Sequence, residues 1–162
     1  MKKTLTILAL LTITFCLGAQ TPKYVFTEAS DLNIIGKIHD NTPNPYHRVD
    51  TVKYKGFTAT ENTQARCPAG LAALFKTNAK TISVKTEFGW ENEMTSTMAI
   101  AYRGYDLYIK DGNRWRWAAA KCAPRKKSDT NVVLINNMDG KEKECMLYLP
   151  IYSEVRSVKI GI

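Results

Sequence analysis

Few side chains in this sequence have the types and spacing that catalysis requires. His47 could act as a base or a metal ligand, but no Ser or Cys nucleophile in a recognisable turn accompanies it, so we interpret it as a loop histidine. The carboxylate pairs Glu91 with Glu93 and Glu142 with Glu144 fall in expected turns, where carboxylates are usually solvated. The sequence contains no Gly-x-Ser-x-Gly elbow, Gly-rich phosphate loop or His-Glu-x-x-His motif. It therefore offers no recognisable catalytic site.

The cysteines also give little support to a metal site. Outside the first 19 residues the chain has three, Cys67, Cys122 and Cys145, at long and irregular spacings from one another and from the histidines. An exported chain could form one disulfide from them and keep one free thiol. We favour the alternative that all three are small buried hydrophobic side chains. No cofactor is expected.

Residues 1–19 have the pattern of a secretory signal peptide. Two lysines precede an apolar run over residues 5–17, which is too short for a membrane span, and two small residues follow it. Cys16 raises the alternative of a lipoprotein, but the bulky Phe15 stands where a small residue is expected. The sequence therefore predicts export to the periplasm or the extracellular space, a single mature domain over residues 20–162, and no membrane span within it.

The charge pattern argues against nucleic-acid binding. The formal net charge is +8, and removing the first 19 residues, with two lysines and no acid, lowers it to +6. Most of the positive charges are scattered, and the one cluster, Arg125-Lys126-Lys127, is typical of a solvated loop tip. A nucleic-acid interface needs a basic face with interleaved aromatic residues. A weak Coulomb attraction to acidic polysaccharide remains open.

The segment 103–117 predicts a β-hairpin. Leu107 and Ile109 alternate with polar residues, which is the period of two expected for a strand with one buried face. Asp111-Gly112 is a strong turn signal, because Gly adopts positive φ without steric cost. We expect the left-handed residue of the loop at Gly112 or Asn113.

The register of this hairpin can be predicted from its two faces. A two-residue Asp-Gly loop would place arginines opposite Leu107 and Ile109. A loop of three or five residues would instead pair Ile109 with Trp115 and Leu107 with Trp117. Because a slip by one residue moves every side chain to the other face, we expect the apolar pairing, with both tryptophans in the core.

The rest of the chain predicts an all-β fold. It lacks helical periodicity, and short apolar segments alternate with Gly, Asn and Asp turns, which favours an antiparallel β-sandwich with a jelly-roll-like arrangement. Trp90 is expected on an exposed loop over residues 89–93. The further expected strands cover residues 32–38, 69–77, 81–88, 131–135, 143–149 and 155–162.

One motif in the hairpin resembles that of a known family. Arg103-Gly104-Tyr105-Asp106-Leu107-Tyr108 is similar to the Gly-x-Asp-Leu-Tyr motif for which the N-terminal domain of bacterial SGNH hydrolase-type esterases is named. The similarity extends over nearly the whole mature chain, in ordered blocks at residues 44–50, 68–72, 75–78, 115–118 and 157–161.

The resemblance implies a β-sandwich placed ahead of an α/β/α esterase domain. In that family the second domain carries the nucleophilic Ser in a Gly-Asp-Ser block and the Asp and His in an Asp-x-x-His block, and the substrates are typically acylated, often acetylated, carbohydrates. None of these blocks occurs in this sequence. The leading hypothesis is a non-catalytic accessory domain of a secreted SGNH-type carbohydrate esterase, with the catalytic domain as its partner. The alternative is a free-standing carbohydrate-binding module.

The motif residues are interpreted as structural. Gly104 would relax the backbone where the strand begins, Asp106 would accept hydrogen bonds from backbone N–H groups or Arg103, Leu107 would lie in the core, and Tyr108 would cover the domain edge. Candidate contacts to a ligand or a second domain are Trp90, Arg103 and Tyr105. Docking predicts a flat apolar patch near the C-terminus, whereas sugar binding predicts a groove of exposed aromatic rings elsewhere.

Overall fold

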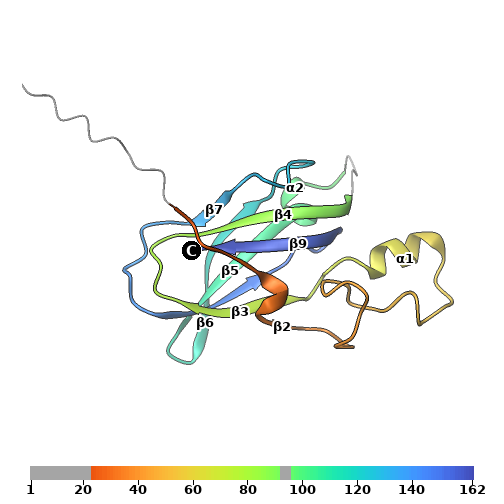
Figure 1. Ribbon diagram of the computed structural model, residues 1–162, viewed down its shortest axis with the longest axis horizontal. Coiled ribbons are helices and arrows are strands. Elements are labelled where there is room, and N and C mark those ends of the chain that lie inside the picture. The colour runs from red at the N-terminus through yellow and green to blue at the C-terminus, as the bar shows by residue number, and fades with distance from the viewer. Residues whose placement is uncertain (1–22, 92–95) are drawn as a thin grey trace, which may run out of the picture.

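The chain folds as an antiparallel β-sandwich in the computed structural model, which describes residues 23–91 and 96–162 (Figure 1). The four-stranded sheet has the order β1 (Phe26–Glu28), β9 (Ser153–Gly161), β4 (Ile82–Glu91) and β7 (Val132–Ile135). The five-stranded sheet has the order β2 (Asn33–Ile35), β3 (Ala72–Thr77), β8 (Lys143–Tyr148), β5 (Gly104–Asp111) and β6 (Arg114–Cys122). The predicted fold class is confirmed. The expected signal peptide and Glu93 lie outside the described residues.

The strand order is that of a jelly roll with one added edge strand. When β2 is set aside, the first strand pairs with the last (β1 with β9), the second with the second last (β3 with β8), and so on through β4 with β7 to β5 with β6. These antiparallel pairs fall alternately in the two sheets, which is the winding of a jelly roll. β2 extends the five-stranded sheet by pairing with β3.

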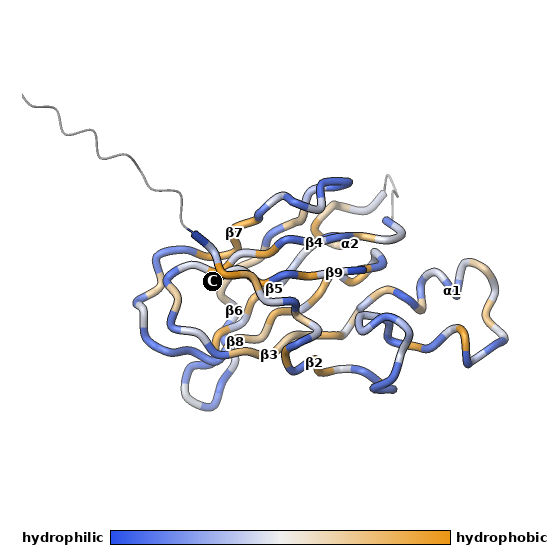
Figure 2. The backbone as a smooth tube through the Cα atoms, in the orientation of Figure 1, coloured by the Kyte–Doolittle hydropathy of each residue, from blue (hydrophilic) through white to orange (hydrophobic). Residues whose placement is uncertain are grey.

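The core lies between the two sheets. Alternate residues of each strand point inward, so that Ile82 and Val84 of β4 and Val158 of β9 face Leu107 of β5 and Leu147 of β8, all with no exposed surface. Figure 2 shows the hydrophobic stretches along the strands and hydrophilic turns at the end of the sandwich near the C-terminus. The alternation in the sequence is therefore a reliable guide to the buried face of most strands.

The β5–β6 hairpin forms as predicted, but its predicted register is wrong. Ile109 pairs with Arg116 and Tyr108 with Trp117, and a bulge shifts the pairing between Leu107 and Tyr108. The loop is the two-residue Gly112-Asn113, with positive φ at the glycine (57°). At the bulge Ala118 and Ala119 pack against the core, while Trp115 and Trp117, before it, lie on the outer face, 38% and 60% exposed.

Two short helices were not expected from the sequence. The first, α1 (Ala59–Ala65), begins at a capping box in which Thr58 and Glu61 bond to each other's backbone N–H. The second, α2 (Ala99–Arg103), leads directly into β5. A 3-10 turn (Ala29–Asp31) follows β1. Neither of the helices in the described residues has the length and apolar character needed to cross a membrane.

The connection between β2 and β3, residues 36–71, forms an arm that extends beyond the sandwich and carries α1 (Figure 1). Its two ends meet at the sheet: a Cβ on Gly36 would lie 2.1 Å from the carbonyl oxygen of Gly70. Gly36 also has φ of +88°, so the chain leaves β2 through a position that only Gly fills without strain. The arm lies at the end of the sandwich away from Ile162.

Candidate functional site

The family-like motif begins with a glycine that touches the preceding helix. A Cβ at Gly104 would lie 2.0 Å from the carbonyl oxygen of Ile100 in α2. Its φ of −83° is ordinary, so the position needs Gly for space and not for backbone freedom. The sequence-based explanation, a relaxed backbone at the start of the strand, is therefore wrong in its cause. Gly104 allows α2 to pack directly against the first residue of β5.

The next residues of the motif alternate between the two faces of the sheet. Tyr105 and Leu107 point into the core with no exposed surface, and Asp106 and Tyr108 lie on the outer face. The hydroxyl of Tyr105 hydrogen-bonds to that of Thr86 at 2.7 Å. Burial raises the pKa of Tyr105. Tyr105, a candidate contact from the sequence, is thus not on a surface where a ligand or a second domain could reach it.

Asp106 and Tyr108 contact other side chains on the outer face. The carboxylate of Asp106 accepts a hydrogen bond from Nε1 of Trp117 at 3.1 Å, and not from Arg103 as the sequence suggested. The ring of Tyr108 packs edge-on against Tyr148, with ring centroids 5.8 Å apart. Arg103 instead donates to the carbonyl oxygen of Ala123 at 2.9 Å. Arg103 therefore connects the start of β5 to the end of β6.

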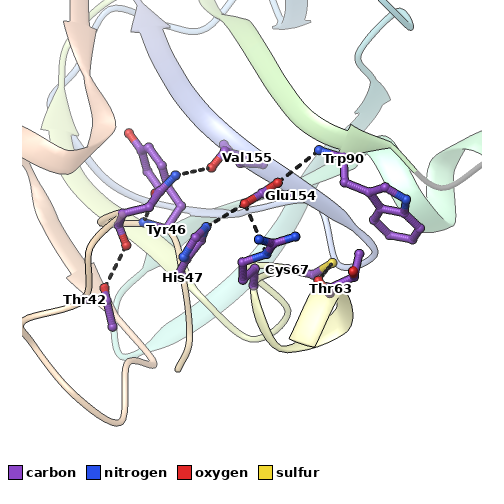
Figure 3. A network of polar contacts seen from close by, with 10 residues as sticks. Thr42, Tyr46, His47, Thr63, Cys67, Trp90, Glu154 and Val155 are labelled. Atoms are coloured by element: carbon purple, nitrogen blue, oxygen red, sulfur yellow. Dashed lines mark hydrogen bonds and ion pairs between the residues drawn. The ribbon is translucent and has the colours of Figure 1, made fainter. Parts of the chain in front are cut away.

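A second cluster of polar groups centres on Glu154 at the start of β9 (Figure 3). Its Oε1 lies 2.9 Å from Nε2 of His47 and 3.4 Å from Nε of Arg66, and its Oε2 accepts the backbone N–H of Trp90 at 3.1 Å. The side chain of Glu154 is only 14% exposed. His47 lies in the limb of the arm before α1, Arg66 in the limb after it, and Trp90 in β4. The carboxylate of Glu154 therefore connects β9 to three separate segments.

Further hydrogen bonds fix the base of the arm. Arg48 donates to the carbonyl oxygens of Cys67 at 2.9 Å and Gln64 at 3.1 Å, which ties the two limbs together. Gln64 in turn donates to the hydroxyl of Tyr152 at 2.8 Å. The amide of Asn44 donates to the carbonyl oxygen of Val155 at 3.0 Å. The arm is therefore held rigidly where it meets β9.

The chemistry of this cluster is that of an anchor. Burial lowers the pKa of His47, although the hydrogen bond and the charge of Glu154 act in the opposite direction. We therefore take His47 as neutral near pH 7, donating one N–H to the carboxylate. The thiol of Cys67 donates to the carbonyl oxygen of Thr63 at 3.6 Å, and burial raises its pKa to about 11. A thiol of that pKa is a poor nucleophile.

No catalytic arrangement is present in the part of the chain that the structure describes. His47 bonds to a carboxylate, and not to a Ser, Thr or Cys that it could activate. Burial also raises the pKa of Cys145 to about 11 and that of Cys122, and all three cysteines are free thiols. Within residues 23–91 and 96–162, no group of three His, Cys, Asp or Glu side chains could hold a metal ion.

Trp90 lies on β4, and not on the exposed loop expected from the sequence. It is 37% exposed and contacts Tyr152 edge-on, with ring centroids 6.1 Å apart. Sequence reasoning missed Glu154 and Arg66 altogether, because they gain their meaning only when the arm folds onto β9. The sequence does contain a local signal for α1, the helix just before Arg66: the capping box Thr58-Ala59-Thr60-Glu61, which is typical of the start of a helix.

Comparisons with known proteins found one matching family and a solved structure with a similar fold. The family described as GxDLY, the N-terminus of SGNH hydrolase-type esterases, matches residues 23–162. A crystal structure of a GDSL-like lipase from Bacteroides ovatus is 34% identical to the chain, covers 86% of it and superimposes with a TM-score of 0.79. The chain spans 41% of that protein's length. Among curated proteins, none matches the chain significantly.

Proposed function

Since the chain belongs to the GxDLY family, which forms the N-terminus of SGNH hydrolase-type esterases, we propose that it is a non-catalytic accessory domain that packs against an SGNH catalytic domain. The substrates of the complete enzyme are acylated, in particular acetylated, carbohydrates. The family match over residues 23–162 is the observation that carries this proposal. The absence of an activated nucleophile from the described residues supports it.

We also propose that the domain works outside the cytoplasm. The first 19 residues act as a signal peptide, and the mature domain covers residues 20–162. Export places the domain where polysaccharide substrates occur. The intact mass of the secreted protein tests this directly, because cleavage after Ala19 would leave Gln20 as the first residue, with or without cyclisation of that glutamine.

The arm is the surface that contacts the catalytic domain. Four of its large apolar side chains are exposed although its base is fixed: Ile38 (74%), Val52 (65%), Phe57 (40%) and Tyr54 (39%). Apolar side chains on a fixed, protruding segment are typical of an interaction site. The sequence predicted the docking patch near the C-terminus, where Val25 (67%) and Ile162 (40%) are exposed, whereas the group on the arm lies at the opposite end of the sandwich.

The size of the Bacteroides ovatus protein is compatible with a catalytic domain that contacts the arm. The matched region accounts for 41% of the Bacteroides ovatus protein, so the rest of that protein is larger than the matched region. A domain of that size is long enough to reach from the region of Ile162 to the arm.

Docking can be measured with the two parts as separate polypeptides. Residues 23–162 are titrated into the part of the Bacteroides ovatus protein that lies outside the matched region, and binding is followed by calorimetry. We expect saturable binding that Val52→Ser and Phe57→Ser together weaken at least about tenfold. Val133→Ser, an exposed apolar residue outside the arm (36%), is the matched control and should leave the affinity unchanged.

The matched region of the Bacteroides ovatus protein itself is the positive control for this titration. If that region binds and the present chain does not, docking through a shared surface is wrong. Equal losses for the arm variant and for Val133→Ser would place the interface elsewhere and contradict the role of the arm.

A further inference from the structure

The outer face of the five-stranded sheet carries a row of aromatic side chains next to charged groups. Trp115 and Trp117 project from the same face of β6, 38% and 60% exposed. The Cα atoms of residues two apart along a strand are about 7 Å apart, so both rings can contact one short stretch of a sugar chain. Tyr108 pairs with Trp117 across the strands and continues the row on β5.

Contacts with neighbouring side chains fix the orientation of both indole rings. Nε1 of Trp117 donates to Asp106 at 3.1 Å, so the edge of this ring is held while the residue stays 60% exposed. The ammonium group of Lys110 lies 5.9 Å from the centre of the Trp115 ring. Rings that are already ordered lose little conformational entropy when a ligand stacks on them.

A largely apolar hollow beside Trp115 has polar side chains among its lining residues. The carboxylate of Glu144 lies 2.7 Å from the ammonium of Lys110 and 3.7 Å from that of Lys76. The hollow has a volume of about 280 Å³, and its lining includes Asn33 and Leu74 in addition to Lys76, Glu144 and Trp115. The hydrogen bond and charge of Lys110 lower the pKa of Glu144, which keeps this carboxylate ionised near pH 7.

These features fit a sugar chain better than any other class of ligand. A pyranose ring has an apolar C–H face that packs on an indole ring and peripheral hydroxyl groups that need both donors and acceptors. The hollow supplies an acceptor in Glu144, a donor in Lys76, and both in Asn33, and Lys110 is a further donor next to Glu144. The charges of Lys76 and Lys110 are balanced by those of Glu144 and Asp106, so the face has no net attraction for an anionic chain.

We propose that the outer face of the five-stranded sheet, around Trp115, Trp117 and the Glu144 hollow, is a binding site for a neutral, pyranose-based polysaccharide. The site lies on a different surface from the arm, so it does not depend on the proposed docking. The sequence-based alternative of sugar binding named Trp90 and Tyr105, whereas the structure assigns the role to the other two tryptophans. In a complete esterase, this face would hold the polymer whose acyl groups are removed.

The test is a titration of residues 23–162 with soluble arabinoxylan, barley β-glucan and galactomannan, followed by tryptophan fluorescence and calorimetry. We expect binding to at least one of them, and a loss of affinity of about tenfold or more in Trp117→Ala and in Trp115→Ala. Trp117→Phe keeps an aromatic ring and should lose less. Trp90→Ala, at the third tryptophan of the chain, is the matched control and should bind like the unchanged protein.

Three outcomes would overturn the proposal. Binding to none of the three polysaccharides would show that neutral polysaccharides are not the ligand. Binding only to polygalacturonate, an anionic polysaccharide, would show that charge attraction and not ring stacking drives binding. An equal loss of affinity in Trp90→Ala would show that the exposed row on β6 is not the site. Because both tryptophans of β6 are exposed, circular dichroism of the variants should match that of the unchanged protein, which separates lost binding from lost folding.

Discussion

Replacing Glu154 by alanine is expected to lower the free energy of unfolding by about 3 kcal/mol, because two donors, the His47 ring and the Trp90 N–H, lose their acceptor at about 1–3 kcal/mol each. The carboxylate is 14% exposed, accepts hydrogen bonds from His47 and from the backbone N–H of Trp90, and forms an ion pair with Arg66. Its removal leaves Arg66 without its counter-charge and the Trp90 N–H without an acceptor. Each buried polar group left unpaired adds to the loss.

Urea unfolding measures this change, and limited trypsin digestion shows where it acts. In Glu154→Ala the arm should be cut after Lys53 or Lys55 faster than in the unchanged protein, because both limbs of the arm lose their bond to β9. Asp111→Asn is the control: it removes an ion pair whose side chains are 61% and 74% exposed, and should change stability by less than about 1 kcal/mol. A similar loss in both variants would contradict the anchoring role of Glu154.

The same anchor gives a pH signature. Burial lowers the pKa of His47 in the folded chain below its unfolded value of 6.5, so the unfolded state binds more protons near and below that pH. The contribution of neutral His47 to the free energy of unfolding is therefore fully present above pH 6.5 and is lost as the pH falls below 6.5. His47→Gln should flatten the pH dependence of the unfolding free energy between about pH 6.5 and 5, above the range where most carboxylates titrate.

Substituting Gly104 by alanine is expected to cost about 3 kcal/mol, the upper end of the range for overpacking. The new Cβ would lie 2.0 Å from the Ile100 carbonyl oxygen and 2.9 Å from its carbon, both backbone atoms that no side-chain rotation can move away. Relief requires α2 to shift away from β5. The motif glycine is therefore expected to be a large single contributor to stability.

Comparing the unfolding free energies of Gly104→Ala and Gly112→Ala by chemical denaturation separates the cost of a steric clash from the cost of backbone strain. Gly112 has φ of +57°, and a Cβ added there would meet nothing within 4 Å. Its substitution therefore costs only the left-handed conformation, about 1–2 kcal/mol. If Gly104→Ala proves the milder of the two, the close packing of α2 on β5 is not what this glycine provides.

The sandwich could be predicted from the sequence because its strands alternate with a period of two and are separated by turn residues. Leu107, Ile82 and Val84 point to the core in the structure as that alternation requires. The register of the hairpin could not be predicted, because the bulge between Leu107 and Tyr108 resets the faces of β6. A bulge depends on tertiary packing and leaves no reliable local pattern.

The functional surfaces were harder to predict than the fold. The motif at Gly104 was visible, but the reason for its glycine, contact with Ile100, emerges only in three dimensions. Trp115 and Trp117 were assigned to the core because they were expected to pair with Ile109 and Leu107, and the structure places both on the outer face. Glu154 could not be found at all, since its partners His47 and Trp90 lie 107 and 64 residues away in the sequence.

The most direct test of the proposed role is hydrolysis of 4-nitrophenyl acetate by purified residues 23–162. The three cysteines are free thiols, the pKa is raised in each, and the His47 ring bonds to a carboxylate, so the described residues offer no activated nucleophile. We expect the rate to equal that of a heat-denatured sample of the same protein. A rate above that control, lost on unfolding, would show that the domain is itself an esterase and would contradict its assignment as a non-catalytic accessory domain.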